Sequence, residues 1–209
     1  MVAYKLTYFE GRGAAEVSRQ ILAYAGQKYE DKRVTREQWP ALKASNPPPF
    51  GQLPLLEVDG KPLAQSHAIA RFLAREFKLN GKTAWEEAQV NSLADQVKDY
   101  FNEIRPFLAV KMGFVTEGDV DALYKDVFLP ALKKNSQFFT NFLKANNSGF
   151  LVGDSLTWVD LVIAQQTADF SGLGADLFNE FPELKAHSAK IQSIPQIKKW
   201  VQTRPVTKF

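Results

Sequence analysis

The period of the hydrophobic pattern changes near residue 80, and this change restricts the possible folds more than any other feature. Before it, short alternating segments are interleaved with short helical ones, whereas every long segment after it repeats with a helical period. The first arrangement is typical of a small α/β domain and the second of an all-helical one. We therefore predict an α+β chain, with an α/β domain over residues 1–79 followed by an all-α domain over residues 84–209.

The first 79 residues predict the order strand, helix, strand, helix, hairpin, helix. The expected elements are a strand over 4–9, a helix that ends at Gly26, a strand over 29–34, a short helix over 36–43, a hairpin over 53–64 and a helix from Ser66. In the first of these helices, Val17, Ile21 and Ala25 share one face. Asp59-Gly60 favours a two-residue hairpin turn, and Pro54 is a candidate for a cis peptide bond.

The later part of the chain predicts helices only. Residues 85–111 and 119–144 are long periodic segments, in which Pro106 and Pro130 predict bends. Thr157 and Asp160 have the spacing of a capping box, which predicts a buried helix through Phe170. Two shorter helices are expected around 182–191 and 195–203, with His187 at the surface.

Composition excludes several kinds of chemistry. The chain has no cysteine and only two histidines, His67 and His187, which argues against a metal site, a disulfide framework or a histidine-centred triad. The net charge of +3 is too small to predict nucleic-acid binding. The longest uncharged stretch, 44–56, is shorter than the about 20 apolar residues of a membrane span. We predict a cytoplasmic protein with no metal, nucleic-acid or membrane partner.

Three segments of the first domain are candidates for a ligand site. Tyr8 stands at the carboxyl end of a predicted strand, where α/β folds bind ligands, although an aromatic residue there is also common in cores. The second segment runs from Phe50 to Pro54. The third, Gln65-Ser66, begins a helix whose amides suit a carboxylate, unless Ser66 only caps that helix.

Taken together, these segments resemble the cytosolic glutathione transferases, and within them the sigma-related class, which includes nematode enzymes and prostaglandin D synthases. The motifs are Tyr8-Phe9-x-Gly11-Arg12-Gly13, Trp39-Pro40-x-x-Lys43, Phe50-Gly51-Gln52-Leu53-Pro54 and Gln65-Ser66-x-Ala68-Ile69-Ala70-Arg71. The resemblance runs nearly end to end, as far as Arg204-Pro205-x-Thr207-Lys208. It implies a thioredoxin-like first domain that binds glutathione and a helical domain that supplies most of an electrophile pocket.

The resemblance also implies a role for each matching residue. Tyr8 would be the catalytic hydroxyl that stabilises the glutathione thiolate. The residues implied to hold glutathione are Tyr8, Trp39, Lys43, Gly51, Gln52, Leu53, Pro54, Gln65 and Ser66, with Asp99 reaching the ligand of the neighbouring subunit in a homodimer. Candidates for the electrophile pocket are Phe9, Gly13, Phe101, Ile104, Arg105, Leu108 and Phe209. Ala14 departs from the pattern, because some members carry an arginine at this position.

Three functions follow from the resemblance. The first is conjugation of glutathione to hydrophobic electrophiles in detoxification, with glutathione as co-substrate and no permanently bound cofactor. The alternatives are glutathione-dependent prostaglandin D isomerisation and non-catalytic binding of haem-like hydrophobic ligands. Retention of Tyr8 and of Gln65-Ser66 favours an enzyme. Simpler interpretations remain for single residues: Lys43 as a solvated lysine, Trp39 as a core residue, and Phe101, Ile104 and Leu108 as a core face.

Overall fold

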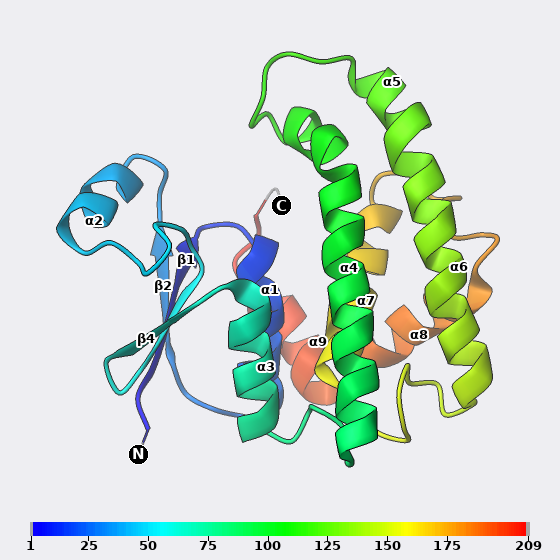
Figure 1. The fold of residues 1–209 in the computed structure, drawn as a ribbon, viewed down its shortest axis with the longest axis horizontal. Coiled ribbons are helices and arrows are strands. Elements are labelled where there is room, and N and C mark those ends of the chain that lie inside the picture. Colours follow the sequence, from blue (N-terminus) through cyan, green and yellow to red (C-terminus); the bar gives the residue numbers. More distant parts are fainter. Residues whose placement is uncertain (1, 208–209) are drawn as a thin grey trace. The chain divides into compact units, whose positions relative to one another are not determined.

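A computed structural model describes residues 2–207 of the protein (Figure 1). These residues form two compact units, the first made of 2–80 with 192–207 and the second of 81–191. The division at residue 80 lies where the hydrophobic period changes. The segment from residue 192 onward groups with the first unit, whereas the sequence analysis placed it in the helical domain. The reason is a buried carboxylate, that of Glu16, which accepts hydrogen bonds from Trp200 and Arg204.

The first unit is built on a four-stranded sheet. Its strands are β1 (Tyr4–Phe9), β2 (Glu30–Val34), β3 (Leu55–Val58) and β4 (Lys61–Ala64), in the order β2-β1-β3-β4. β1 and β2 run parallel, and the other two pairs are antiparallel. Asp59 and Gly60 connect β3 to β4 with positive φ angles of 48° and 80°. Two positive φ angles are what a two-residue hairpin turn of the predicted kind requires.

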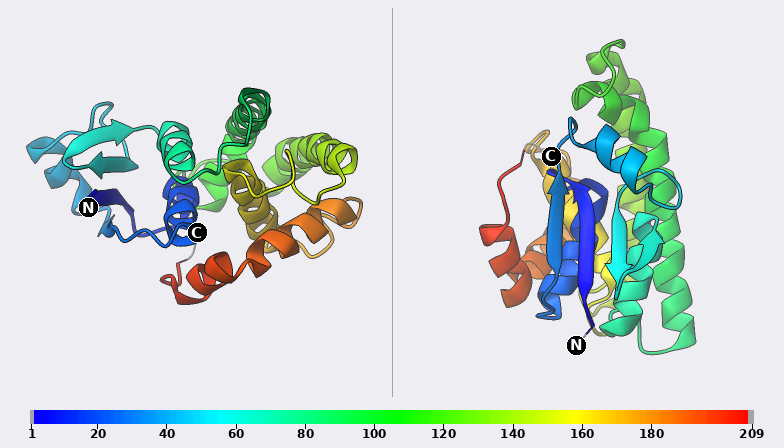
Figure 2. Two further views of the ribbon diagram at one scale, coloured as in Figure 1. Left: turned by 90° about the horizontal axis from the view of Figure 1, so that it is seen from below. Right: turned by 90° about the vertical axis from the view of Figure 1, so that its left-hand side faces the viewer.

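The same unit contains several helical segments. They are the 3-10 turn η1 (Gly13–Ala15), α1 (Glu16–Tyr24), α2 (Trp39–Ser45), α3 (Ser66–Glu76) and α9 (Pro195–Thr203). α1 and α3 pack side by side on one face of the sheet (Figures 1 and 2). Leu6, Leu56, Ile21 and Leu73 have no exposed surface in this layer. This mixed sheet with flanking helices is the predicted thioredoxin-like arrangement.

The buried face of α1 differs from the predicted one. Ile21 is buried as expected, but Ala25 is exposed, and the charged residues Glu16 and Arg19 are buried instead. A hydrophobic pattern does not reveal this, because a charged side chain enters a core only where it finds partners. The predicted helix end is confirmed: α1 stops at Tyr24 and is followed by Gly26 with a φ of 63°.

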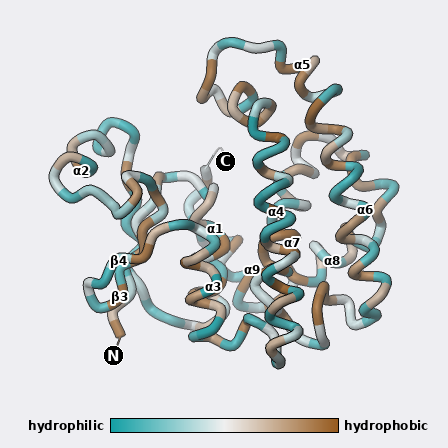
Figure 3. Tube along the Cα trace, viewed as in Figure 1, coloured by the Kyte–Doolittle hydropathy of each residue, from teal (hydrophilic) through white to brown (hydrophobic). Residues whose placement is uncertain are grey.

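The second unit contains helices only. These are α4 (Ala84–Lys111), α5 (Val120–Leu123), the π-helical segment η2 (Tyr124–Phe128), α6 (Leu129–Asn146), α7 (Trp158–Ser171) and α8 (Pro182–Ser193), which reaches the boundary of the unit. Hydrophilic and hydrophobic residues alternate along α4, as in an amphipathic helix (Figure 3). α4 packs against α7, whose residues are mostly buried. Within residues 2–207, none of the helices combines the length and the apolar character needed to cross a membrane.

The two prolines predicted to bend helices have different effects. α4 continues through Pro106 to Lys111 as one helix. Pro106 removes the hydrogen bond to the carbonyl of Asn102, and this loss is tolerated because Asn102 is exposed and water can take the place of the donor. Before Pro130 the helix changes its form, because η2 forms a π-helical turn in which the Leu129 amide donates to the Tyr124 carbonyl.

The predicted capping box at the start of α7 is confirmed. Asp160, fully buried, accepts from the backbone and the hydroxyl of Thr157 at 2.8 and 2.7 Å, and from the Leu151 amide at 2.8 Å. The prediction that His187 lies at the surface is wrong. Its side chain is buried, with Nε2 2.9 Å from Asp160 Oδ1. Asp160 therefore joins the cap of α7, the preceding loop and α8.

We expect Asp160→Ala to lower the free energy of unfolding by about 2–4 kcal/mol, because several buried polar groups lose their acceptor. Urea unfolding followed by circular dichroism measures this change. The matched control is Asp154→Ala in the same segment, whose carboxylate is exposed and pairs with Lys82. An exposed ion pair contributes little, so this variant should unfold like the wild type. Equal losses in both variants would contradict the role given to Asp160.

Candidate active site

Tyr8 lies near the end of β1, where the chain turns into α1. Its side chain is half-buried, and its hydroxyl oxygen accepts a hydrogen bond from the Ala14 amide at 3.2 Å. Because the oxygen is the acceptor in this contact, the hydroxyl proton is left to be donated to another group. Ala14, the position that departs from the family pattern, thus contributes through its backbone.

Gly13 makes this close approach possible. Its φ is +39°, and a Cβ atom placed on it would lie 2.6 Å from the Tyr8 hydroxyl oxygen. Any other residue here would both strain the backbone and push the phenol ring out of its place. Gly13 was predicted as a pocket residue, and its immediate neighbour in the structure is the side chain of Tyr8.

A row of aromatic rings continues from Tyr8 toward α2. The ring centroids of Tyr8 and Phe9 are 5.5 Å apart, and those of Phe9 and Trp39 are 5.8 Å apart. Lys43, one helical turn after Trp39, places its Nζ atom 5.8 Å from the centre of the Trp39 ring. A Cβ atom on Gly51 would lie 3.2 Å from Lys43 Cε, so the lysine side chain runs along this glycine. The structure therefore brings together residues from three separate sequence motifs.

The segment after Gly51 leads into β3. Gln52 is exposed, Leu53 is half-buried and Pro54 is buried. The Leu53–Pro54 peptide bond is cis, as the sequence indicated. This segment returns the chain to the sheet, where Leu55 pairs with Thr7 of β1.

Gln65 and Ser66 mark the start of α3. Gln65 has a φ of 74° and a ψ of 115°, a conformation rarely taken by residues other than glycine, and it occupies the N-cap position. Its side chain makes no capping hydrogen bond. Ser66 is the first residue of the helix and not its cap, so the simple capping interpretation of Ser66 is wrong. A helix start whose N-cap side chain makes no capping bond suits a carboxylate ligand.

The remaining predicted residues lie on α4, in the second unit. Asp99, Phe101 and Arg105 are exposed, and Leu108 is half-buried. Ile104 has no exposed surface, so its side chain is part of the core and does not face an open pocket. Phe209, the last predicted pocket residue, lies outside the described residues.

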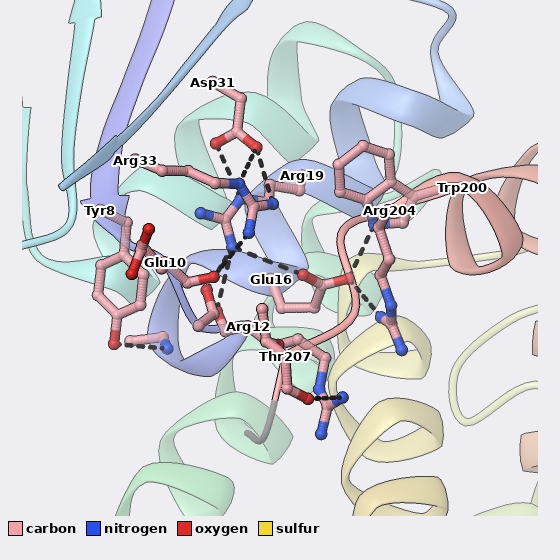
Figure 4. A network of polar contacts seen from close by, with 12 residues as sticks. Tyr8, Glu10, Arg12, Glu16, Arg19, Asp31, Arg33, Trp200, Arg204 and Thr207 are labelled. Atoms are coloured by element: carbon pink, nitrogen blue, oxygen red, sulfur yellow. Dashed lines mark hydrogen bonds and ion pairs between the residues drawn. The ribbon is translucent and has the colours of Figure 1, made fainter. Parts of the chain in front are cut away.

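Two arginines that the sequence analysis missed hold the turn after Tyr8 (Figure 4). Arg33 Nη1 donates to the Glu10 carbonyl at 2.7 Å. Arg19 Nη1 donates to the Gly11 carbonyl at 2.9 Å and to the Arg12 carbonyl at 3.3 Å. Three successive backbone carbonyls are thus fixed by two guanidinium groups.

Carboxylates hold these arginines in turn. Asp31 accepts from Arg19 Nε at 3.0 Å and from Arg33 Nε at 2.9 Å. Burial raises the pKa of the neighbouring Tyr29 hydroxyl, and the Asp31 charge raises it further, so Tyr29 remains an uncharged phenol. No local pattern in the sequence points to this network, because its members lie on β2, α1 and the turn. Among residues 2–207, no three His, Asp or Glu side chains are grouped so as to hold a metal ion.

Comparisons with known proteins show the family of the chain. The family model for the glutathione S-transferase N-terminal domain matches residues 4–75, and that for the C-terminal domain matches residues 104–204. The chain is 73% identical to a probable glutathione S-transferase 5 of Caenorhabditis elegans over the whole length of both. It is equally identical to a nematode-specific glutathione S-transferase of C. elegans with a crystal structure, at a TM-score of 0.97 and full coverage of both chains. A prostaglandin synthase D of Nilaparvata lugens is 32% identical, with a TM-score of 0.85 and coverage of 98% and 100%.

The fold and the matches define a two-part enzyme, with a thioredoxin-like domain followed by a helical domain. The chain belongs to the glutathione S-transferase family, and its co-substrate is glutathione.

We expect Gly13→Ala to lower kcat/KM at least about tenfold, because the added Cβ displaces the Tyr8 hydroxyl. The matched control is Gly26→Ala, which also has a positive φ but has no atom within 4 Å of the added carbon. Both substitutions should destabilise the protein by about 1 kcal/mol through backbone strain. Steady-state kinetics and thermal unfolding separate the two effects. Equal activity of the two variants would show that the close approach to Tyr8 has no catalytic importance.

Proposed function

We propose that the protein conjugates glutathione to hydrophobic electrophiles, and that the Tyr8 hydroxyl stabilises the glutathione thiolate. The observation that carries the proposal is the hydrogen bond from the Ala14 amide to the Tyr8 oxygen. It orients the phenol so that its proton is free for a ligand atom. The half-buried side chain, near the end of a strand, leaves room for such a contact.

The energy required is within the reach of one hydroxyl. A free cysteine thiol has a pKa of about 8.5, so only a few per cent is ionised at pH 7. Lowering this pKa to about 6.5 requires about 2.7 kcal/mol of preference for the anion. A hydrogen bond to a charged acceptor contributes about 1.5–3 kcal/mol. Donation by Tyr8 therefore accounts for most of the shift.

The first unit offers complementary groups for the rest of the tripeptide. Lys43 would meet the glycyl carboxylate, with the Trp39 ring beside it and Gly51 leaving space for the lysine chain. The start of α3, at Gln65 and Ser66, would receive the γ-glutamyl carboxylate. Between these two ends, the Gln52-Leu53-Pro54 segment would pair its backbone with the cysteinyl unit.

The helical unit would supply the electrophile side and the subunit contact. Phe101, Arg105 and Leu108 have exposed or half-exposed side chains on α4 and would contact a hydrophobic electrophile. Asp99 is exposed on the same helix and would reach the glutathione of a second subunit in a homodimer. We assign the protein to the sigma-related class, in the cytoplasm, with detoxification as its role.

A second activity, glutathione-dependent prostaglandin isomerisation, is supported by one observation. The prostaglandin synthase D of N. lugens shares the fold at 32% identity over nearly the whole chain. Both conjugation and isomerisation need the same thiolate, so a substitution of Tyr8 would affect both. A direct assay of prostaglandin H2 turnover distinguishes the two reactions. Formation of prostaglandin D2 with glutathione present would establish the isomerase, and only conjugation would exclude it.

We expect Tyr8→Phe to bind glutathione normally but to lose most conjugation at pH 7. The thiolate is the reactive form, so kcat/KM should rise with pH through the pKa of the bound thiol. That pKa should be about 6.5 in the wild type and about 8.5 in the variant. Activity of the variant should therefore recover in part above pH 8. Conjugation to a chromogenic aryl halide, measured between pH 5.5 and 9, gives both profiles.

The control for this experiment is retention on immobilised glutathione, which Tyr8→Phe should share with the wild type. Identical pH profiles of the two proteins would remove Tyr8 from the mechanism. Binding without conjugation of several electrophiles by the wild type would instead favour the non-catalytic, ligand-binding alternative.

Lys43 provides a separate test of how glutathione is bound. Lys43→Ala should raise the KM for glutathione about two- to fivefold, because an exposed lysine contributes only modestly to pairing with a carboxylate. kcat should stay unchanged, since the contact is remote from sulfur. Lys61→Ala, in the exposed end of the β3–β4 hairpin, is the matched control and should leave both constants unchanged. An unaltered KM in Lys43→Ala would remove Lys43 from the glutathione site.

A further inference from the structure

The turn between β1 and α1 is held by a charged side chain that has no exposed surface. Arg19 is fully buried, and its Nη1 atom donates to the carbonyls of Gly11 and Arg12. Its guanidinium carbon lies 5.8 Å from the centre of the Tyr8 ring, within the range of a cation–π contact. Arg19 therefore contacts both the backbone of the turn and the ring whose hydroxyl the turn positions.

Glu16 connects this arginine to a distant part of the chain. One of its oxygens, Oε2, lies 3.7 Å from Arg19 Nη1. The other, Oε1, accepts from Trp200 Nε1 at 2.8 Å and from Arg204 Nη1 at 2.6 Å (Figure 4). Trp200 belongs to α9, and Arg204 follows that helix directly. The carboxylate is 2% exposed, so its charge is balanced by these partners and not by water.

A second contact joins the same part of the chain to the turn. Arg12 Nη1 donates to the Thr207 carbonyl at 3.5 Å, while the carbonyl of Arg12 accepts from Arg19. The turn is thus held through Glu16 and Arg19 on one side and through Arg12 on the other.

A contribution to stability is, by itself, a weak explanation for the burial of these charges. Taking charges out of water costs free energy, and well-packed apolar residues often replace buried ion pairs without loss of stability. A guanidinium, however, supplies several donors in a fixed planar geometry, which an apolar side chain cannot do. These donors fix a turn that can move very little relative to Tyr8. The Ala14 amide lies 3.2 Å from the Tyr8 oxygen, and Gly13 leaves no room for a Cβ atom.

We propose that Arg19 is a positioning residue for Tyr8, and that Glu16, held by Trp200 and Arg204, keeps Arg19 in place. The inference rests on the proposed role of Tyr8 and deepens it. Arg19 touches neither substrate in this mechanism. It sets the distance between the Ala14 amide and the Tyr8 oxygen, and through it the direction in which the phenol donates its proton.

The test is the ionisation of glutathione bound to the complete protein, followed by the ultraviolet absorbance of the thiolate. Arg19→Lys keeps the charge but loses the planar set of donors. We expect it to raise the pKa of the bound thiol by about 0.5–1 unit and to lower kcat about tenfold. The Kd of glutathione should change less than about threefold, because no contact with the tripeptide is removed.

Two milder variants test the link to α9 if Arg19→Lys does not fold. Trp200→Phe removes only the indole donor, and Arg204→Gln removes the charge that faces Glu16. Both should shift the thiol pKa in the same direction as Arg19→Lys, but by less. The control is Asp160→Asn in the helical unit, which should lower the melting temperature without moving the thiol pKa.

The outcomes separate the inference from the proposed function. If Tyr8→Phe raises the thiol pKa but Trp200→Phe and Arg204→Gln only lower the melting temperature, as Asp160→Asn does, the positioning role is wrong and the function of Tyr8 stands. If Tyr8→Phe leaves the thiol pKa unchanged, the proposed function itself fails. A shift in the thiol pKa in the α9 variants at unchanged Kd supports the inference.

Discussion

A guanidinium group buried without exposed surface determines the backbone of the turn on which the candidate site depends. Arg19 can occupy that position because Asp31 and Glu16 balance its charge from two sides. Its hydrogen bonds to successive carbonyls then leave the turn little freedom. The half-buried phenol of Tyr8, the missing side chain of Gly13 and the Ala14 amide all meet at this turn. A buried electrostatic constraint therefore supports the backbone of a site for which we propose a hydrogen-bonding role.

Local sequence signals were sufficient for several elements of both units. Alternation predicted β1, the Asp59-Gly60 pair predicted the hairpin, and the spacing of Thr157 and Asp160 predicted the cap of α7, because each of these features is determined within a few neighbouring residues. The row from Tyr8 to Lys43 was anticipated only through the resemblance to a family. Spacing alone does not say that Phe9 lies between Tyr8 and Trp39.

The burial of polar side chains was not predictable from the hydrophobic pattern. That pattern assigns His187 to the surface, but its partner Asp160, 27 residues earlier, is buried. The burial of Glu16 and Arg19 was not anticipated either, because it depends on partners outside α1. Ile104 lies on a helix face on which core and pocket residues have the same spacing, so periodicity does not separate them. α4 continues through Pro106, where the lost hydrogen bond falls on the exposed side of the helix and water can replace the donor.

The contribution of α9 to the first unit has a consequence for the order in which the protein can fold during synthesis. Residues 2–80 leave the ribosome with Glu16 but without the indole and guanidinium groups that neutralise it, since these are made about 180 residues later. Until then, the Glu16 carboxylate must stay hydrated or keep Arg19 as its cationic neighbour. The side chains around it therefore cannot yet pack so closely that water is excluded. The helical unit has its own cap and core and can fold in this interval. The unit translated first is thus completed after the unit translated second.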